Sequence, residues 1–218
     1  MRINKYVALA NGMSRRAADT AIEQGRVSIN GQPPTPGQQI REEDTVTLDS
    51  LPITTAVKTQ TIILNKPVGY VVSRDGQGSK TIYDLLPKEF HNLKPVGRLD
   101  KDSSGLLLLT NDGKLAHELT HPSFQKEKVY EVVLDKLLAD TDRHRIESGV
   151  TLEDGLSKLK LEGKEKEWTV RMSEGRNRQI RRTFDAVGYK VGGLHRVQFG
   201  DYSICDLDFG AYKKVETD

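Results

Sequence analysis

The apolar run Leu106–Leu109 most constrains the fold of this chain, because consecutive leucines bounded by turn residues predict a buried strand. A polar segment, residues 97–105 (GRLDKDSSG), comes directly before this run and contains Arg98 and Asp100. A loop at the mouth of a buried strand can hold a reactive side chain still while a substrate reaches it. The same residue types also form ordinary surface turns by bonding to their own backbone. Local chemistry alone leaves a reactive loop and a plain turn both open.

The chain from residue 61 onward predicts one sheet with helices packed on it. Short apolar or alternating stretches are typical of strands, and apolar residues three or four apart are typical of helices. Strands are expected at 62–64, 106–109, 130–134, 159–161 and 168–172, and helices at 115–119 and 180–187. Many short strands and few helices favour an α+β fold with a mostly antiparallel mixed sheet flanked by helices.

The first fifty residues predict a smaller, separate unit. Apolar spacing indicates a helix from Ile3, and Ser14 is a good N-cap for a second helix that Gly25 can end. The alternating residues before Asn30-Gly31 indicate a strand that enters a tight turn. Residues 49–60 have no clear period and are expected to be a linker. We therefore expect domains at 1–48 and 61–218.

Composition excludes several classes of protein. The formal net charge is only +2, so the overall balance does not by itself demand a polyanionic partner. The single cysteine, Cys205, excludes an internal disulfide framework and a multi-cysteine metal site. Charged residues near the N-terminus and the short apolar stretch after them predict neither a signal peptide nor a membrane span. We expect a soluble, cytoplasmic protein with no membrane partner.

Basic residues nevertheless gather in two parts of the chain. Residues 1–30 contain five basic and two acidic residues, and residues 171–182 contain five arginines and one glutamate. Such clusters can bind RNA phosphates, although they are also common on solvated surfaces. By the helical period of Ile180, Phe184 and Val187, Arg178 and Arg182 point away from the apolar face and Arg181 lies at its edge. A partly buried Arg181 needs an anionic partner, either a structural carboxylate or Asp100.

Four blocks from residue 97 onward resemble the RsuA-type pseudouridine synthases, which act on ribosomal RNA. The first is GRLDKDSSGLLLLTNDG at 97–113, and the others are KVYEV at 128–132, EGRNRQIRR at 174–182 and GLHRV at 193–197. They occur in the order that the family has. A shorter block, NKPVG at 65–69, resembles the opening of the same domain and is expected to be structural.

This resemblance implies roles for particular residues. Asp100 becomes the catalytic nucleophile, Arg181 its paired arginine, and Tyr130 the ring against the uracil base. Leu194 is expected near the target base, and we assign Arg98 and Arg178 to substrate binding with it. The further expected RNA contacts in this domain are Arg176 and Arg182.

The N-terminal unit resembles the alpha-L RNA-binding domain found in many of these synthases. The resemblance is carried by RINKY at 2–6, SRRAAD at 14–19 and GRVSING at 25–31. It implies an RNA-anchoring module. Its expected RNA contacts are Arg2, Lys5, Arg15, Arg16 and Arg26.

The resemblance as a whole implies isomerisation of uridine to pseudouridine at a chosen site in ribosomal RNA, free or in a pre-ribosomal particle. The uridine is expected to be flipped out to Asp100, which attacks either the uracil ring or the anomeric carbon. We expect a monomer that uses no cofactor and no metal. Two alternatives stay open: a non-catalytic RNA-binding ribosome assembly factor, and a nucleoside hydrolase that cuts the same bond.

Other motifs give weaker signals. Residues 75–80 are glycine-rich but lack the spacing of a phosphate-binding P-loop, and a mobile loop is expected there. His117 and His121 are four apart on a possible helix, without an evident third metal ligand. The spacing of Asp100 and Asp102 leaves a glycosidase-type pair of carboxylates open.

Overall fold

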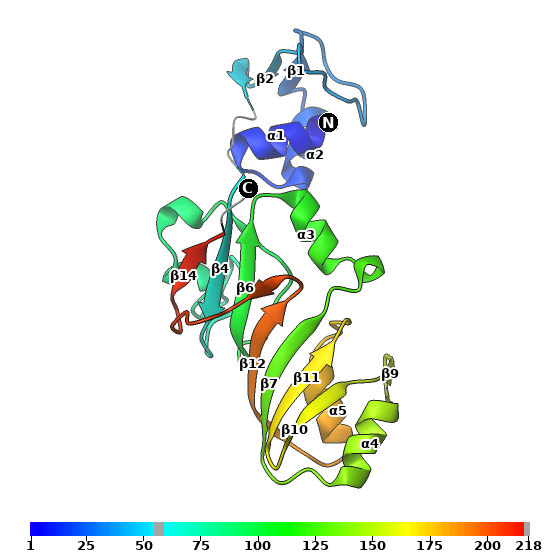
Figure 1. Ribbon diagram of the computed structural model, residues 1–218. Coiled ribbons are helices and arrows are strands. Elements are labelled where there is room, and N and C mark those ends of the chain that lie inside the picture. The colour runs from blue at the N-terminus through cyan, green and yellow to red at the C-terminus, as the bar shows by residue number, and fades with distance from the viewer. Residues whose placement is uncertain (55–58, 216–218) are drawn as a thin grey trace. The chain divides into compact units, whose positions relative to one another are not determined.

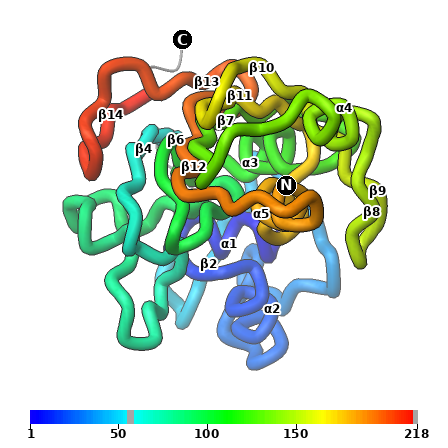
Figure 2. The backbone as a smooth tube through the Cα atoms, turned by 90° about the horizontal axis from the view of Figure 1, so that it is seen from below, coloured from blue at the N-terminus to red at the C-terminus, as the bar shows by residue number. Residues whose placement is uncertain are grey.

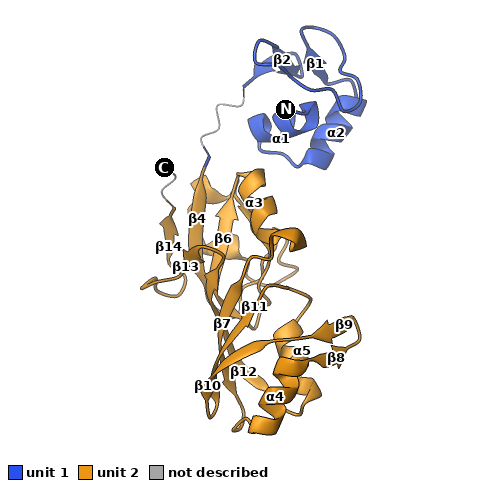
Figure 3. Ribbon diagram, turned by 45° about the vertical axis from the view of Figure 1, so that its right-hand side comes forward, with its two compact units in different colours: residues 1–59 blue, residues 60–218 orange. Residues whose placement is uncertain are grey.

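The computed structural model describes residues 1–54 and 59–215, and it divides into two compact units, 1–59 and 60–218 (Figures 1 and 3). The chain has the α+β architecture expected from its pattern, with a small N-terminal unit and a larger unit built on a sheet. Within the described residues, no helix is both long and apolar enough to cross a membrane.

Two short helices and a three-stranded antiparallel sheet make up the first unit. Helix α1 begins after Arg2, and the Ser14 hydroxyl accepts a hydrogen bond from the Ala17 amide (3.0 Å) to cap α2. Strands β1, β2 and β3 are neighbours in that order. The bounds are α1 Ile3–Asn11, α2 Arg15–Glu23, β1 Val27–Ile29, β2 Val46–Leu48 and β3 Leu51–Ile53.

Two details of this unit differ from the sequence expectation. Asn30 and Gly31 do form a tight turn, both with positive φ, and a single bridge between Ile29 and Gln32 closes it. The pairing goes no further on that side, and the long partner of β1 is β2. Residues 51–53, placed in the expected linker 49–60, form β3 and pair with β2. Residues 55–58 of that segment lie outside the described residues.

The second unit is organised by a long sheet whose path is β10-β11-β7-β12-β6-β4-β14 (Figures 1 and 2). All pairs along it are antiparallel except β12 with β6, which run parallel, so the mostly antiparallel mixed sheet is confirmed. The path strands are β4 Thr61–Lys66, β6 Ser104–Thr110, β7 Lys128–Leu134, β10 Lys160–Lys164, β11 Glu167–Met172, β12 Val191–Phe199 and β14 Tyr212–Lys214. Two short strands lie off this path and pair with inner strands, β5 Lys94–Pro95 with β6 and β13 Tyr202–Ser203 with β12.

Helices and a hairpin accompany this sheet. Helix α4 contacts β10, while α5 contacts both β12 and the hairpin formed by β8 and β9. The α-helices and hairpin strands are α3 Gly113–Thr120, α4 Asp140–Ser148, α5 Gln179–Ala186, β8 Val150–Leu152 and β9 Gly155–Ser157. Short 3₁₀ turns occupy η1 Ile82–Leu85, η2 Lys88–Phe90 and η3 Pro122–Phe124.

Strand β6 is the buried strand that its leucines predict. Leu107 and Leu109 belong to one core cluster and Leu106 and Leu108 to another, and all four side chains are fully buried. The alternation follows from the strand period of two, which turns successive side chains to opposite faces of the sheet. The strand is thereby fixed from both sides, and so is the start of the loop that precedes it.

Gly105 allows β6 to lie against β12. It faces Arg196 in the parallel pair and has φ +109°, and a Cβ at this position would overlap the backbone of Arg196. Glycine is required here for both space and conformation. The contact brings the end of the 97–103 loop beside a strand that comes ninety residues later in the chain.

Candidate active site

Lys66 anchors the loop that carries Asp100. This residue ends β4, its side chain is completely buried, and its ammonium group donates hydrogen bonds to three backbone carbonyls. The acceptors are the oxygens of Pro67 (3.1 Å), Asp100 (3.0 Å) and Ser103 (2.6 Å). The cation therefore ties both ends of the Asp100–Ser103 turn to the end of β4. The sequence indicated only a structural block here.

Burial lowers the pKa of Lys66 to about 8, because the charged form loses its hydration, and Asp100 and Asp102 oppose this shift. At neutral pH the group stays mostly protonated. The loop thus has a positive charge beneath it, directed at its carbonyl oxygens.

Arg178 faces both acidic residues of the loop. Its guanidinium donates a two-pronged hydrogen bond to the Asp102 carboxylate (2.8 and 2.9 Å), and its Nη1 lies 3.6 Å from Oδ2 of Asp100. The hydrogen bonds from Arg178 are the main reason that the pKa of Asp102 is lowered. Asp102 is therefore the ion-pair partner of Arg178. This pairing differs from the arrangement of two glycosidase acids, in which both carboxyl groups act on the substrate.

The pairing expected for Arg181 needs correction. Its Nη1 donates to the carbonyl of Val191 and its Nη2 to the carbonyl of Asp102, both at 2.7 Å. Its Nε lies 3.4 Å from the carboxylate of Asp102, whereas Asp100 has Arg178 as its ion-pair partner. Because carbonyl oxygens accept from both Nη atoms of Arg181, this arginine connects Val191 to the loop at Asp102, two residues after Asp100.

A cleft of about 960 Å³ opens over the loop. Its lining includes Asp100, Arg98, Tyr130, Leu194 and Arg178, which come from the loop, from β7, from β12 and from the start of α5. The Tyr130 and Leu194 side chains are mostly buried in the cleft wall, but the Asp100 carboxyl is one-third exposed. The carboxylate is therefore partly open to solvent.

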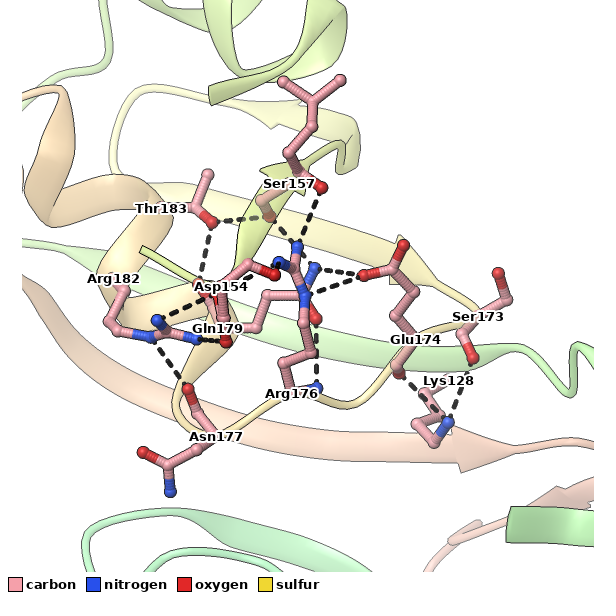
Figure 4. Close-up of polar contacts among 11 residues, drawn as sticks. Lys128, Asp154, Ser157, Ser173, Glu174, Arg176, Asn177, Gln179, Arg182 and Thr183 are labelled. Carbon is pink, nitrogen blue, oxygen red and sulfur yellow. Dashed lines mark hydrogen bonds and ion pairs between the residues drawn. The ribbon is translucent and has the colours of Figure 1, made fainter. Parts of the chain in front are cut away.

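One wall of the cleft is locked by ion pairs (Figure 4). Arg176 donates to Asp154 of the β8–β9 hairpin (3.0 Å) and to Glu174 (3.1 Å), and Arg182 donates to the same Asp154 (2.6 and 3.1 Å). Below them, Gln179 reaches Glu174 and the Ser157 hydroxyl, each at 3.0 Å. Arg176 and Arg182, expected as RNA contacts, are thus already partnered by carboxylates within the unit.

The basic residues of the first unit differ in how they are held. Arg26 donates a close two-pronged hydrogen bond to Asp49 (2.7 and 2.5 Å), and Arg15 donates to the side-chain oxygen of Asn4 (3.2 Å). Arg2 and Arg16 are exposed, and Lys5 is half-buried. RNA binding at Arg26 would compete with its carboxylate, whereas exposed cations are open to phosphates.

A metal centre has no support in the described part of the chain, where no group of three or more His, Cys, Asp or Glu side chains is arranged to hold an ion. His117 and His121 instead pack with Phe124 as rings, with centroids 4.7 to 6.3 Å apart.

Comparison with known proteins connects both units to families. The model of the RNA pseudouridylate synthase family matches residues 60–186, and the S4 domain model matches residues 1–46.

Whole-length relatives agree with these matches. An RNA pseudouridine synthase of Aquifex aeolicus is 35% identical, with 99% of this chain and 90% of that protein covered. The ribosomal large subunit pseudouridine synthase B of Bacillus subtilis is 32% identical, covering 98% and 91%. A solved pseudouridylate synthase is 34% identical with a TM-score of 0.72, covering 99% of this chain and 96% of that one. The chain belongs to the RNA pseudouridylate synthase family.

Proposed function

We propose that this enzyme isomerises a specific uridine of ribosomal RNA to pseudouridine, with Asp100 as the nucleophile. The observation that carries the proposal is the position of the Asp100 carboxylate, at the floor of a cleft with Tyr130 and Leu194 in its wall and Arg178 3.6 Å away. Ribosomal RNA as the substrate is supported by the name of the Bacillus subtilis relative and by the S4 match. The substrate places the proposed activity in the cytoplasm.

The charges around Asp100 suit the proposed nucleophile. The guanidinium of Arg178 lies 3.6 Å from the Asp100 carboxylate and offsets its negative charge. Lys66 adds a second positive charge behind the loop and fixes the Asp100 backbone through its carbonyl. Arg181 positions Asp102, two residues after Asp100, by donating to its carbonyl. We assign Arg181 a positioning role in place of the direct contact expected from the family pattern.

The reaction is balanced within the substrate. The bond from N1 of uracil to the ribose breaks, a bond from C5 to the same ribose carbon forms, and the proton of C5 is replaced by one on N1. Asp100 attacks either the ring or the ribose carbon and is released at the end. Because no atom is gained or lost, the isomerisation needs neither an oxidant nor a second substrate.

The cleft wall offers a place for the detached base. Tyr130 presents an aromatic ring and Leu194 an aliphatic group beside Asp100, and such surfaces bind the faces of an extruded base. Arg98, exposed at the rim, is assigned to the substrate as well. In this proposal one monomer contacts the RNA through these residues and through the exposed cations of the S4 domain.

The test compares wild type with Asp100→Asn on ribosomal RNA transcripts, measuring pseudouridine formation and RNA affinity separately. We expect product from wild type only, and equal affinity for both proteins because Asn keeps the size of the side chain. Wild-type binding without product would favour an assembly factor, and release of free uracil would identify a hydrolase. Either result would refute the proposed activity.

A further inference from the structure

Two cations in the cleft differ from the arginines described above. Lys128 begins β7, and Arg196 lies on the neighbouring strand β12; both line the cleft. The Lys128 ammonium lies 5.1 Å from the centre of the Phe199 ring, and the Arg196 guanidinium lies 4.9 Å from it. The two positive groups therefore share one aromatic surface.

Their hydrogen bonds within the described chain leave donors to spare. Lys128 donates to the backbone oxygens of Ser173 (3.3 Å) and Glu174 (3.1 Å), as Figure 4 shows, so one of its three N–H groups remains. Arg196 is only 2% exposed and its Nε donates to the carbonyl of Leu106 (2.8 Å). Its Nη2 is buried without a hydrogen-bond partner among the described residues.

The carboxylates in this neighbourhood have other partners. Glu127 lies 3.2 Å from Arg171, Asp201 lies 3.2 Å from Lys126, and the Glu174 carboxylate lies 3.1 Å from Arg176. Burial and the charge of Arg196 both lower the pKa of Lys128, which is the response of a cation without a matching anion. Desolvated charge of this kind is costly unless an anion compensates it. The cleft thus has an unfilled requirement for negative charge.

The strand register places Lys128 and Arg196 next to Tyr130 and Leu194, the residues proposed to hold the target base. Arg196 lies directly across from Tyr130 in the β12–β7 pair, and Lys128 precedes Tyr130 by two residues on the same face. Leu194 precedes Arg196 by two residues on its own strand. Each cation is therefore displaced by two residues, about 7 Å, along its own strand: Lys128 from Tyr130 on β7, and Arg196 from Leu194 on β12.

We propose that Lys128 and Arg196 form a phosphate subsite that holds a phosphodiester of the RNA beside the target uridine. The proposal rests on the proposed function, because RNA is the ligand. The subsite fixes the backbone of the extruded nucleotide while its base lies against Tyr130. The subsite binds the substrate and the transition state equally strongly.

The salt dependence of RNA binding tests this subsite. The slope of log affinity against log salt falls by about 0.7 to 0.9 for each phosphate contact removed. Wild type, Lys128→Met and Lys128→Arg are compared on a ribosomal RNA transcript between about 50 and 200 mM salt. Lys160→Met, which removes the same charge from an exposed position on β10, is the matched control.

We expect the slope to fall in Lys128→Met, to be restored in Lys128→Arg and to be unchanged in Lys160→Met. KM should rise about tenfold in Lys128→Met with kcat unchanged, because one charge-assisted contact of uniform strength is lost. An unchanged slope in Lys128→Met, an equal fall in Lys160→Met, or no RNA binding by wild type overturns the subsite. Product formation with an unchanged slope refutes the subsite alone, whereas an altered slope without wild-type product refutes the isomerase alone.

Discussion

Lys66→Met should change how the stability of the second unit depends on pH. The folded protein holds the pKa of Lys66 at about 8, below the ordinary 10.5 that the unfolded chain has. Between these values the unfolded state binds more protons, so the free energy of unfolding rises as the pH rises. The gap of about 2.5 units at about 1.4 kcal/mol each gives wild type about 3 kcal/mol of added stability across this window. Lys66→Met lacks the titrating group and loses this rise.

The assay is urea denaturation of both proteins at a series of pH values from about 7.5 to 10.5, the window set by the two pKa values. Tyr83, whose pKa is raised by burial, is present in both proteins, so its contribution cancels in the difference. Lys164→Met removes an exposed lysine and should keep the wild-type slope. Equal slopes for wild type and Lys66→Met would refute the claim that the buried ammonium is strained by desolvation. The variant should also lose kcat, because the Asp100 carbonyl loses its anchor.

Two further substitutions test the frame of the site. Gly105→Ala should destabilise the second unit by about 3 kcal/mol or more in thermal unfolding, because its Cβ meets the Arg196 backbone, while Gly113→Ala, with open space around it, should not. Asp102→Asn should have a lower free energy of unfolding than wild type above pH 3.8, because the pKa of Asp102 is lowered in the folded protein. The difference between the two proteins should shrink as acid protonates Asp102 in wild type. A difference that stays constant through the acid titration would contradict the pairing with Arg178.

The sequence predicted the elements whose apolar residues repeat. Strand β6, with its run of leucines, and helix α2, with Ser14 as its cap, are confirmed because burial and capping leave direct marks in the residue order. Helix α4 was missed because its nine residues bury only Ile146, so they have no apolar period. Strand β3 was missed because Leu-Pro-Ile does not alternate: Leu51 and Pro52 are exposed and Ile53 is half-buried.

The site was harder to predict, since its geometry depends on backbone turns. The helical period placed Arg178 away from the apolar face, but Arg178 precedes α5 as its N-cap with a left-handed φ of +47°. It faces Asp102 and Asp100 instead of continuing the helix. The triple carbonyl contact of Lys66 joins residues up to 37 positions apart, and local sequence contains no signal for it.

The parallel seam between β6 and β12 has a consequence for synthesis of the protein. A growing polypeptide completes the Asp100 loop and β7 well before β12 leaves the ribosome, and long-range pairings of this kind form late. Until β12 arrives, Tyr130 is paired on one side only, with Val170 of β11, and Arg196 is missing from the cleft. A nascent chain therefore has the Asp100 carboxylate before it has the β12 side of the cleft, and the cleft is complete only when this central strand is inserted.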